Sequence, residues 1–390
     1  VAKIMIQKNE FVLKEGEWSG WVPMSFPMPG ALQGVSAMCR FFLKSVRDDF
    51  ELYVSPVNMD PLDPALPIST PSSYSRELTQ SVGRFYTQGI AEDTKALSAR
   101  VFTDDEYREQ AIYVLEEEIR IFQHTLEGFK EGFFFHYFST LDLNSHMFWR
   151  ALDPGHPLYT PDLARRHGDF LPWLYGKMDE VVGQAMARTD DHTHLMVLSD
   201  HGFGSFRRQF NLNSWLMDVG YATHARNAPR GEVPLFGDVD WRKTKAYGLG
   251  INALYLNITG RERDGVVSPG QEADALVKEL IMRLKDVRDP ATGDRIISNV
   301  YRRDEIYSGP YVHEAPDLIV GYNPGYRASW DTVLGTYPKE HVSDNMDPWS
   351  GDHATDSAFM QGVLLSNRKI RTDAPALSDL APTILGEFGV

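Results

Sequence analysis

Cysteine is nearly absent from this sequence of 390 residues, in which Cys39 is the single example. One thiol excludes an intrachain disulfide and a cluster of thiolate metal ligands. A metal site in this chain must therefore use histidine, aspartate or glutamate. Long apolar runs are absent as well, since no uninterrupted stretch reaches the roughly 18 to 20 residues that a membrane-spanning helix needs.

Basic residues are fewer than acidic ones, 39 against 54, which gives a formal net charge of -15 at pH 7. A field of this sign repels polyanions and acidic membrane surfaces, so we expect no nucleic acid polymer as a partner. A small phosphorylated substrate is compatible with the charge, because a bound divalent cation reverses the potential locally.

The first residues, "VAKIMIQKNEF", do not combine a charged stretch with an apolar one and therefore do not form a signal peptide. A strand-like pattern begins at the first residue instead. We therefore expect the sequence to be part of a longer chain. The sequence specifies neither a cellular location nor an oligomeric state.

The length of the chain exceeds the size at which one hydrophobic core stops growing, and its apolar content of 42% is ordinary for a globular protein. Residues 1–55 contain several stretches rich in β-branched and aromatic residues, separated by Gly, Pro and Asp turns. A Pro-rich crossing follows them. We therefore expect a β-rich subdomain with its crossing over residues 1–75.

Helical and strand patterns alternate over residues 76–390. "EEEIRIFQHTLEGFK" and "EADALVKELIMRLKDV" have the spacing of amphipathic helices, and "KAYGLGINALYLNITG" predicts a strand pair. The apolar runs "GFFFHYFST" (132–140) and "HLMVLS" (194–199) predict central strands covered on both faces, a pattern that "APDLIVGY" and "FMQGVLLS" repeat. Together these patterns predict an α/β fold with a doubly wound, mostly parallel sheet, helices on both faces, and a cap-like insertion at about 222–345.

Metal-binding residue types lie just beyond two of these predicted strands, where open α/β sheets bind their ligands. Asp142 and His146, in "STLDLNSHMFW", are four residues apart, so one helical turn places them on the same side. Asp200 and His201, in "LSDHGFGSF", directly follow the aliphatic strand. Each pair can offer a carboxylate oxygen and an imidazole nitrogen to one ion.

His353, in "WSGDHATDS", precedes the next predicted strand, and Gly202 lets the chain turn after Asp200 without a Cβ clash. Each candidate has a structural alternative when taken alone. Asp142 is then a helix cap, His146 or His353 a hydrogen-bonded core histidine, and Asp200 a turn residue. The occurrence of such residues in three separate segments favours a shared metal site.

The segments "DLNSH", "SDHGFGSF" and "GDH", in this order and followed by "DLAPTIL", resemble the metal-binding motifs of the alkaline phosphatase superfamily. The resemblance is to its type I phosphodiesterase and nucleotide pyrophosphatase branch and covers residues 130–390. It implies an alkaline phosphatase-like core that lacks its N-terminal strand or strands. It also implies one divalent ion on Asp142, His146 and His353, and another on Asp200 and His201.

The ligand set, with three histidines, favours zinc, and manganese or iron are alternatives. Ser145 departs from the family, which often has glycine at this position, and we expect only a local change in the turn. The function implied is hydrolysis of a small phosphate ester, most often a phosphodiester or a nucleotide pyrophosphate, with a Thr or Ser nucleophile.

The family's nucleophile, and the strand ending in Asp that precedes it, are not recognisable within residues 1–55. We expect both to lie upstream of this sequence and expect little or no turnover from these 390 residues alone. Thr70, in "ISTPSSYS", is the candidate nucleophile within the chain. A Pro-rich linker with Ser and Thr at turns is the favoured interpretation of that segment.

Other functions are compatible with the same residues. A phosphomonoesterase, a sulfatase or a relative of cofactor-independent phosphoglycerate mutase would share the ligands, because the nucleophile and the cap decide the substrate. The Ser motif and basic substrate residues of the mutase are not recognisable. A catalytically inactive binding module is the alternative from another class, and the presence of all five candidate ligands argues against it. Arg207 and Arg208 are interpreted as solvated surface charge, with pairing to a phosphate oxygen as the alternative, and His136 as packed in the core or as a partner that orients a metal ligand.

Overall fold

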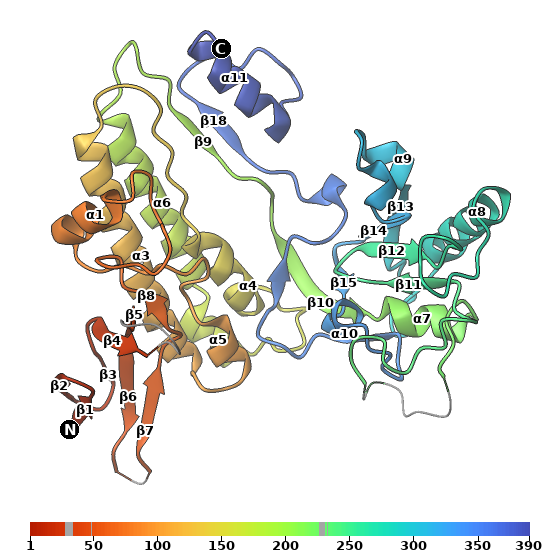
Figure 1. Cartoon of the computed structure of the whole chain (residues 1–390), viewed down its shortest axis with the longest axis horizontal. Helices are drawn as coiled ribbons and strands as arrows, with labels where there is room; N and C mark the ends of the chain where they lie inside the picture. Colours follow the sequence, from red (N-terminus) through yellow and green to blue (C-terminus); the bar gives the residue numbers. More distant parts are fainter. Residues whose placement is uncertain (28–33, 48, 226–230, 232) are drawn as a thin grey trace. The chain divides into compact units, whose positions relative to one another are not determined.

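The computed structural model describes residues 1–27, 34–47, 49–225, 231 and 233–390. The chain forms two compact units, Val1–Asn144 and Ser145–Val390, whose elements are drawn in Figure 1. Their boundary falls inside one continuous helix, α4 (Thr140–Leu152). The domain limits expected from the sequence, at residue 75 and at about 222–345, stay predictions.

The N-terminal part of the first unit is β structure, as the sequence predicts. Its strands are β1 (Ala2–Ile6), β2 (Asn9–Leu13), β3 (Glu17–Trp18), β4 (Val22–Phe26), β5 (Val35–Cys39), β6 (Phe41–Ser45), β7 (Glu51–Val54) and β8 (Asn58–Met59). They pair antiparallel in three small sheets, β1–β2, β3–β6–β7 and β4–β5–β8. β5 and β6 supply the centre of the core here, where Cys39, Phe41 and Leu43 are buried.

Three helices complete the first unit: α1 (Tyr74–Val82), α2 (Thr94–Ser98) and α3 (Asp104–Gly128). α3 contains the predicted amphipathic segment but begins about a dozen residues before it. Its start is set by a capping box, in which the Thr103 hydroxyl accepts from the Glu106 backbone and the Glu106 carboxylate accepts from the Thr103 backbone. Such reciprocal bonds satisfy two backbone groups that a helix start leaves open.

Residues 132–139 do not form the predicted strand, and no strand of the described residues pairs with them. Every second ring packs against Phe122 of α3; these rings are Phe134, His136 and Phe138. The rings between them are exposed: Phe133, Phe135 and Tyr137. The strand prediction fails because no neighbouring strand in the described part of the chain supplies backbone hydrogen bonds to this run, and the predicted cover on both faces is found on one face only. The prediction that His136 packs in the core is met in part, by a half-buried ring.

The helices of the second unit, besides most of α4, are α5 (Pro161–His167), α6 (Phe170–Met186), α7 (Leu212–Asp218), α8 (Gln271–Lys285), α9 (Arg303–Ile306), α10 (Trp330–Leu334) and α11 (Leu380–Glu387). Its strands are β9 (Met196–Leu198), β10 (Gly204–Phe210), β11 (Ala246–Gly248), β12 (Ala253–Leu256), β13 (Ile297–Arg302), β14 (Leu318–Tyr322), β15 (Gly325–Ala328), β16 (Val342–Asp344), β17 (Gly351–Asp352) and β18 (Leu364–Ser366). The helix α8 and the strand pair β11–β12 confirm the sequence predictions.

Mixed strands and helices confirm the α/β class, but the expected doubly wound parallel sheet is not found in the described part of the chain. The sheets β11–β12–β14–β13 and β9–β18 are antiparallel, and β10 pairs antiparallel with β16 and β17. Of the pairs between these named strands, β10–β15 alone is parallel. The prediction erred because apolar runs identify buried strands without fixing their direction, which depends on the connections between them.

The main hydrophobic core of the second unit lies around the sheet β11–β12–β14–β13 with α7 and α8, and its buried members run from Phe210 to Val342. Leu254, Leu256 and Leu280 are fully buried there. Described residues of the segment that the sequence predicts as an insertion therefore form much of this packed core.

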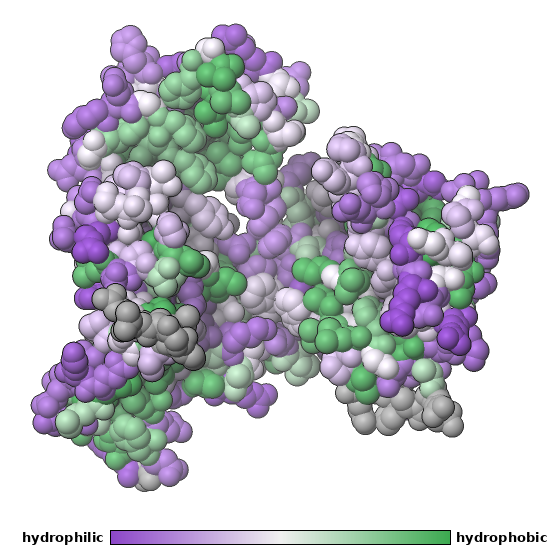
Figure 2. All heavy atoms as spheres, in the orientation of Figure 1, coloured by the Kyte–Doolittle hydropathy of each residue, from purple (hydrophilic) through white to green (hydrophobic). Residues whose placement is uncertain are grey.

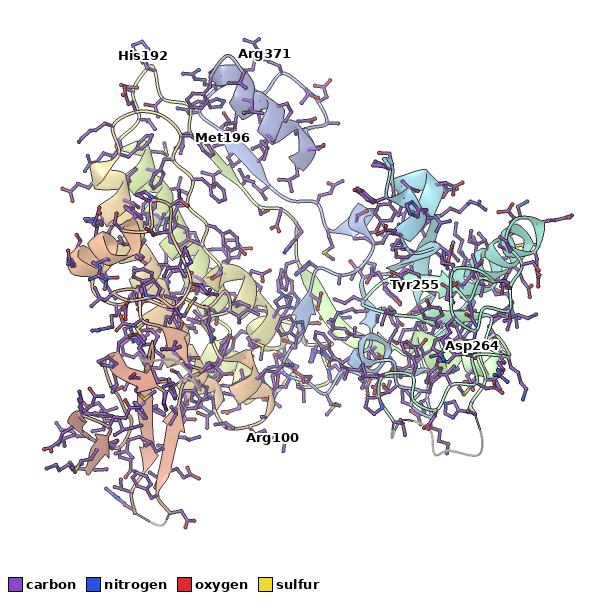
Figure 3. The ribbon with its side chains drawn as sticks, viewed as in Figure 1. Arg100, His192, Met196, Tyr255, Asp264 and Arg371 are labelled. Carbon is purple, nitrogen blue, oxygen red and sulfur yellow. The ribbon has the colours of Figure 1, made fainter. Side chains whose placement is uncertain are left out.

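In contrast to this core, β9, β18 and α11 are poorly buried. α11 has no buried residue, and both Leu198 and Leu365 are exposed. Figure 2 shows apolar side chains at the surface near these elements, and Figure 3 places Met196 on β9. The strand predicted from "HLMVLS" is present, but its predicted cover on both faces is not found among the described residues.

No helix in the described part of the chain combines the length and the apolar character needed to span a bilayer.

Candidate metal centre

Helix α4 carries two of the predicted ligands, Asp142 and His146, one turn apart. The hydroxyl groups at the start of this helix donate hydrogen bonds to a half-buried carboxylate. Glu118 of α3 accepts hydrogen bonds from the Ser139 hydroxyl at 2.9 Å and from the Thr140 hydroxyl at 3.3 Å. The first turn of α4, on which Asp142 stands, is thereby fastened to α3.

A second carboxylate, that of the buried Glu92, contacts the same turn. The side-chain amide of Asn144 donates to the Thr140 carbonyl at 2.8 Å and to Glu92 at 3.4 Å. Burial and, after it, the negative charge of Glu118 raise the pKa of Glu92 to about 8. Sequence reasoning missed Glu92 because it lies in an irregular segment with no motif around it.

His353 lies directly after β17, which pairs antiparallel with β10. Ligand atoms of Asp142, His146 and His353 all lie within 4.8 Å of one another. Two segments far apart in the sequence thus bring together a carboxylate oxygen and two imidazole nitrogens. These are three of the five ligands predicted from the sequence.

His201, which follows β9, stacks on His353 with ring centroids 3.6 Å apart and an interplanar angle of 14°. Oδ1 of Asp200 lies 3.5 Å from Nε2 of His201, and the Asp200 side chain is exposed. A Cβ atom on Gly202 would lie 2.7 Å from the Gln361 carbonyl oxygen, so glycine is needed where these two backbones approach. The assignment of Asp200 and His201 to a second ion stays a prediction.

Backbone carbonyl groups orient two of the imidazole rings. Nδ1 of His146 lies 2.7 Å from the Gly351 carbonyl oxygen, and Nδ1 of His201 lies 2.9 Å from the Gly202 carbonyl oxygen. A carbonyl oxygen only accepts, so Nδ1 of each ring carries the proton and Nε2 carries the lone pair. Metal-binding histidines are commonly oriented through their other nitrogen in this way.

Aromatic rings pack against these histidines, an arrangement that was not predicted from the sequence motifs. The indole of Trp349 stacks on His146 with centroids 3.7 Å apart. The ring of Phe203 lies 4.7 Å from that of His146 and 5.7 Å from that of His353. Apolar walls lower the local dielectric constant and so strengthen the interaction of an ion with its ligands.

The glycine of the "GDH" motif is required by packing. A Cβ atom on Gly351 would lie 2.6 Å from the Ser145 carbonyl oxygen and 2.9 Å from Cβ of Trp149. Ser145, the residue that departs from the family pattern, is itself buried. Its hydroxymethyl group is accommodated without displacing His146 from its bond to the Gly351 carbonyl.

Asp352 is buried beside the two histidines of the centre and was not predicted as a site residue. Its Oδ1 accepts from the backbone N–H of His353 and of Ala354, each at 2.8 Å. Its Oδ2 accepts from the indole N–H of Trp349 at 2.7 Å. Burial opposes its ionisation, but the charge of Arg327, with the hydrogen bonds from the Ala354 backbone and the Trp349 indole, outweighs burial and holds the pKa of Asp352 below its usual value.

Other residues considered at the sequence level lie in structural roles. Thr70 is an exposed residue of an irregular segment before α1. Arg207 forms two hydrogen bonds of 2.6 Å with Asp153, and Arg208 forms bonds of 2.6 and 2.8 Å with Asp289. Arg207 is 47% exposed and is thus a surface charge that pairs with Asp153, whereas Arg208, at 18%, is not the solvated charge that the sequence predicted.

Asp142, His146 and His353 fit a divalent ion by the chemistry of their donors. Two neutral imidazole nitrogens and one carboxylate oxygen form a set that suits zinc and is also used by manganese and iron. Convergence within 4.8 Å is close enough for the three atoms to share one ion after small adjustments.

Comparison with protein families gives one result: the profile described as type I phosphodiesterase / nucleotide pyrophosphatase matches residues 18–343. The match includes four of the predicted ligands and ends ten residues before His353. Neither the curated proteins nor the solved structures contain a match to the chain.

Proposed function

Because the chain belongs to the type I phosphodiesterase and nucleotide pyrophosphatase family, a branch of the alkaline phosphatase superfamily, we propose that it is a metal-dependent hydrolase of phosphodiesters or nucleotide pyrophosphates. The observation that carries the metal-dependent part is the convergence of Asp142, His146 and His353 within 4.8 Å. Family membership alone supports phosphoester hydrolysis, and the convergence supports these three residues as its metal site.

In this proposal one divalent ion, with zinc favoured, binds Asp142, His146 and His353, and a second binds Asp200 and His201. Bound divalent ions would neutralise phosphoryl charge and lower the pKa of an attacking hydroxyl group. The chain's own contribution is orientation. Carbonyl groups hold Nδ1–H of His146 and His201, so that each Nε2 lone pair has a fixed direction.

Small substrates are favoured over polymers, because a net charge of -15 opposes the long-range approach of a polyanion. We expect the nucleophile to be a Thr or Ser, and Thr70 is the candidate within these residues. The exposed position of Thr70 in a Pro-rich segment supports a linker instead.

Zinc affinity, measured by competition with a chromophoric chelator, tests the centre directly. We expect His353→Ala to weaken zinc binding by at least about 10-fold, because it removes a donor from a small ligand set. His313→Ala is the control, since His313 is an exposed histidine of the same unit. A wild-type chain that binds no divalent ion at micromolar concentration, or an unchanged affinity in His353→Ala, would contradict the proposal.

Substrate class is tested by comparing bis(p-nitrophenyl) phosphate with p-nitrophenyl phosphate and p-nitrophenyl sulfate in the presence of zinc or manganese. We expect low turnover, metal-dependent and greatest on the diester, and we expect Thr70→Ala to leave it unchanged. Preference for the monoester or the sulfate would favour the corresponding relative of the superfamily. Robust activity that Thr70→Ala abolishes would make Thr70 the nucleophile.

A further inference from the structure

Arg327, on β15, is the largest fully buried side chain in the described part of the chain, with 1% of its surface exposed. Burying a guanidinium costs several kcal/mol, on the order estimated for any ion removed from water, unless other groups compensate for it. Its Cζ lies 4.1 Å from the ring centroid of Trp330 and 4.9 Å from that of Phe206. Its Nε lies 3.1 Å from Oδ2 of Asp352.

Asp352 connects this arginine to the candidate metal centre. The carboxylate holds the backbone N–H of His353 with one oxygen and the indole of Trp349 with the other. Trp349 in turn stacks on His146, and Oδ2 of Asp352 lies 3.9 Å from Nδ1 of His146. One carboxylate therefore orients both a ligand loop and the ring that packs on a second ligand.

We propose that Arg327 is a positioning residue of the metal centre, which fixes the Asp352 carboxylate and thereby the two histidines, His146 and His353. This inference rests on the proposed function, because it assumes that these histidines bind an ion. Arg327 contacts neither histidine in any interaction described above. It acts through Asp352, whose negative charge it balances in a buried environment.

The aromatic sandwich explains why arginine is needed at this place. A planar guanidinium can lie against Trp330 and Phe206 while its edge faces a carboxylate, whereas a lysine ammonium is a compact, strongly hydrated charge. An apolar residue of similar length would fill the space but leave Asp352 without a counter-charge. The carboxylate would then be free to turn away from the His353 backbone.

The test is Arg327→Met, with zinc affinity measured by chelator competition and the ligand geometry followed by the visible absorption bands of the cobalt(II)-loaded chain. We expect zinc binding to weaken by about 10- to 100-fold, the range for loss of a group that orients a metal ligand. We also expect altered cobalt bands, because the bands depend on the positions of the donor atoms. Arg327→Lys should recover part of the affinity.

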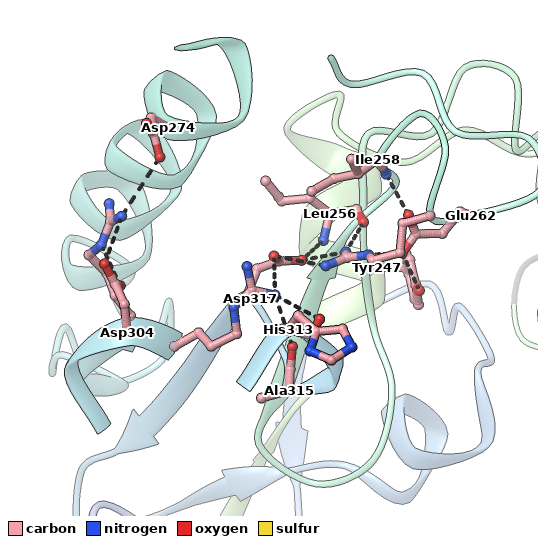
Figure 4. A network of polar contacts seen from close by, with 12 residues as sticks. Tyr247, Leu256, Ile258, Glu262, Asp274, Asp304, His313, Ala315 and Asp317 are labelled. Carbon is pink, nitrogen blue, oxygen red and sulfur yellow. Dashed lines mark hydrogen bonds and ion pairs between the residues drawn. The ribbon is translucent and has the colours of Figure 1, made fainter. Parts of the chain in front are cut away.

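Arg261→Met is the matched control. Arg261 pairs with the buried carboxylate of Asp317 at 2.6 Å, in the network drawn in Figure 4, and the two partner carboxylates, Asp317 and Asp352, are 5% and 4% exposed. This pair has further contacts with Leu256, Glu262 and Arg303, and none of these residues is a predicted ligand. We expect this variant to lose stability and to keep its zinc affinity and cobalt bands.

Equal loss of affinity in both variants, or wild-type affinity in a folded Arg327→Met chain, would overturn the inference. If Arg327→Met does not fold, Asp352→Asn answers the same question, because it retains the side-chain shape and removes the charge. Unchanged zinc affinity in Asp352→Asn would then overturn it. A wild-type chain without metal affinity would instead contradict the proposed function, so the two failures are distinguishable.

Discussion

Glu92 shows how a single buried residue can couple the first turn of α4 to pH. Its side chain is fully buried and accepts a hydrogen bond from the side-chain amide of Asn144, which is two residues after the predicted ligand Asp142. Burial, followed by the charge of Glu118, raises its pKa from 4.5 to about 8. The carboxyl group is therefore neutral in the folded chain at neutral pH.

Glu92→Gln is expected to make folding less dependent on pH. In the wild type, the unfolded chain releases the Glu92 proton above its ordinary pKa of 4.5, while the folded chain holds it up to about pH 8. The stability contributed by the neutral group is thus complete below pH 4.5 and decreases as pH rises to about 8, by about 1.4 kcal/mol per pH unit at most.

Urea unfolding of wild type and Glu92→Gln at several pH values between 5 and 8 measures this effect. We expect the variant to gain stability relative to the wild type as pH rises, because glutamine has no proton to release. Glu127→Gln is a control, since that residue is exposed on α3. A constant difference between wild type and variant over the whole range would show that Glu92 has an ordinary pKa.

At the scale of elements, the second unit contains two layers with very different packing. The sheet β11–β12–β14–β13 lies in the main hydrophobic core, where Leu256 of β12 is completely buried. The strand pair β9–β18 exposes Leu365, whose side chain is 59% accessible. β12 and β18 are both apolar in sequence, so the difference in burial comes from the residues that surround each strand.

Leu256→Ala and Leu365→Ala make the same chemical change in these two layers. We expect Leu256→Ala to cost about 2 to 5 kcal/mol of unfolding free energy, because it leaves a cavity in a packed core. Leu365→Ala should change stability by less than about 0.5 kcal/mol, because its side chain has little contact to lose. Chemical denaturation of both variants gives the comparison, and a large loss in Leu365→Ala would show that another surface covers β18 in solution.

At the scale of the whole molecule, the excess of acidic residues sets the long-range field. With a net charge of -15, the chain repels other polyanions except close to a bound cation. This property follows from composition and does not depend on the arrangement of the two units.

We expect the wild-type chain to pass through a heparin column at about 0.1 M salt, where exposed charges still act over about 10 Å. Fluorescence anisotropy should likewise detect no binding to a labelled single-stranded DNA. A positively charged variant of the same fold would reverse both results. Retention of the wild type on heparin that increases as salt is lowered would contradict the prediction that polymers are not partners.

Much of the local structure was predictable because it depends on neighbouring residues. The strands within residues 1–55, helix α8 and the pair β11–β12 follow from patterns of period two and of three to four. The start of α3 and the absence of a strand at residues 132–139 were not predicted. The first was missed although its capping box, Thr103 with Glu106, is a local sequence pattern. The second depends on long-range packing, because a strand needs a neighbouring strand to pair with.

The sequence by itself determined the types of candidate ligand and their order along the chain, since "DLNSH", "SDHGFGSF" and "GDH" are readable without coordinates. It excluded thiolate ligands through its single cysteine. Only the tertiary structure brought His353 to Asp142 and His146, placed Arg327 beside Asp352 and made most sheets antiparallel. The reason is physical: composition and short spacing fix which atoms are available, whereas long-range packing fixes which of them meet.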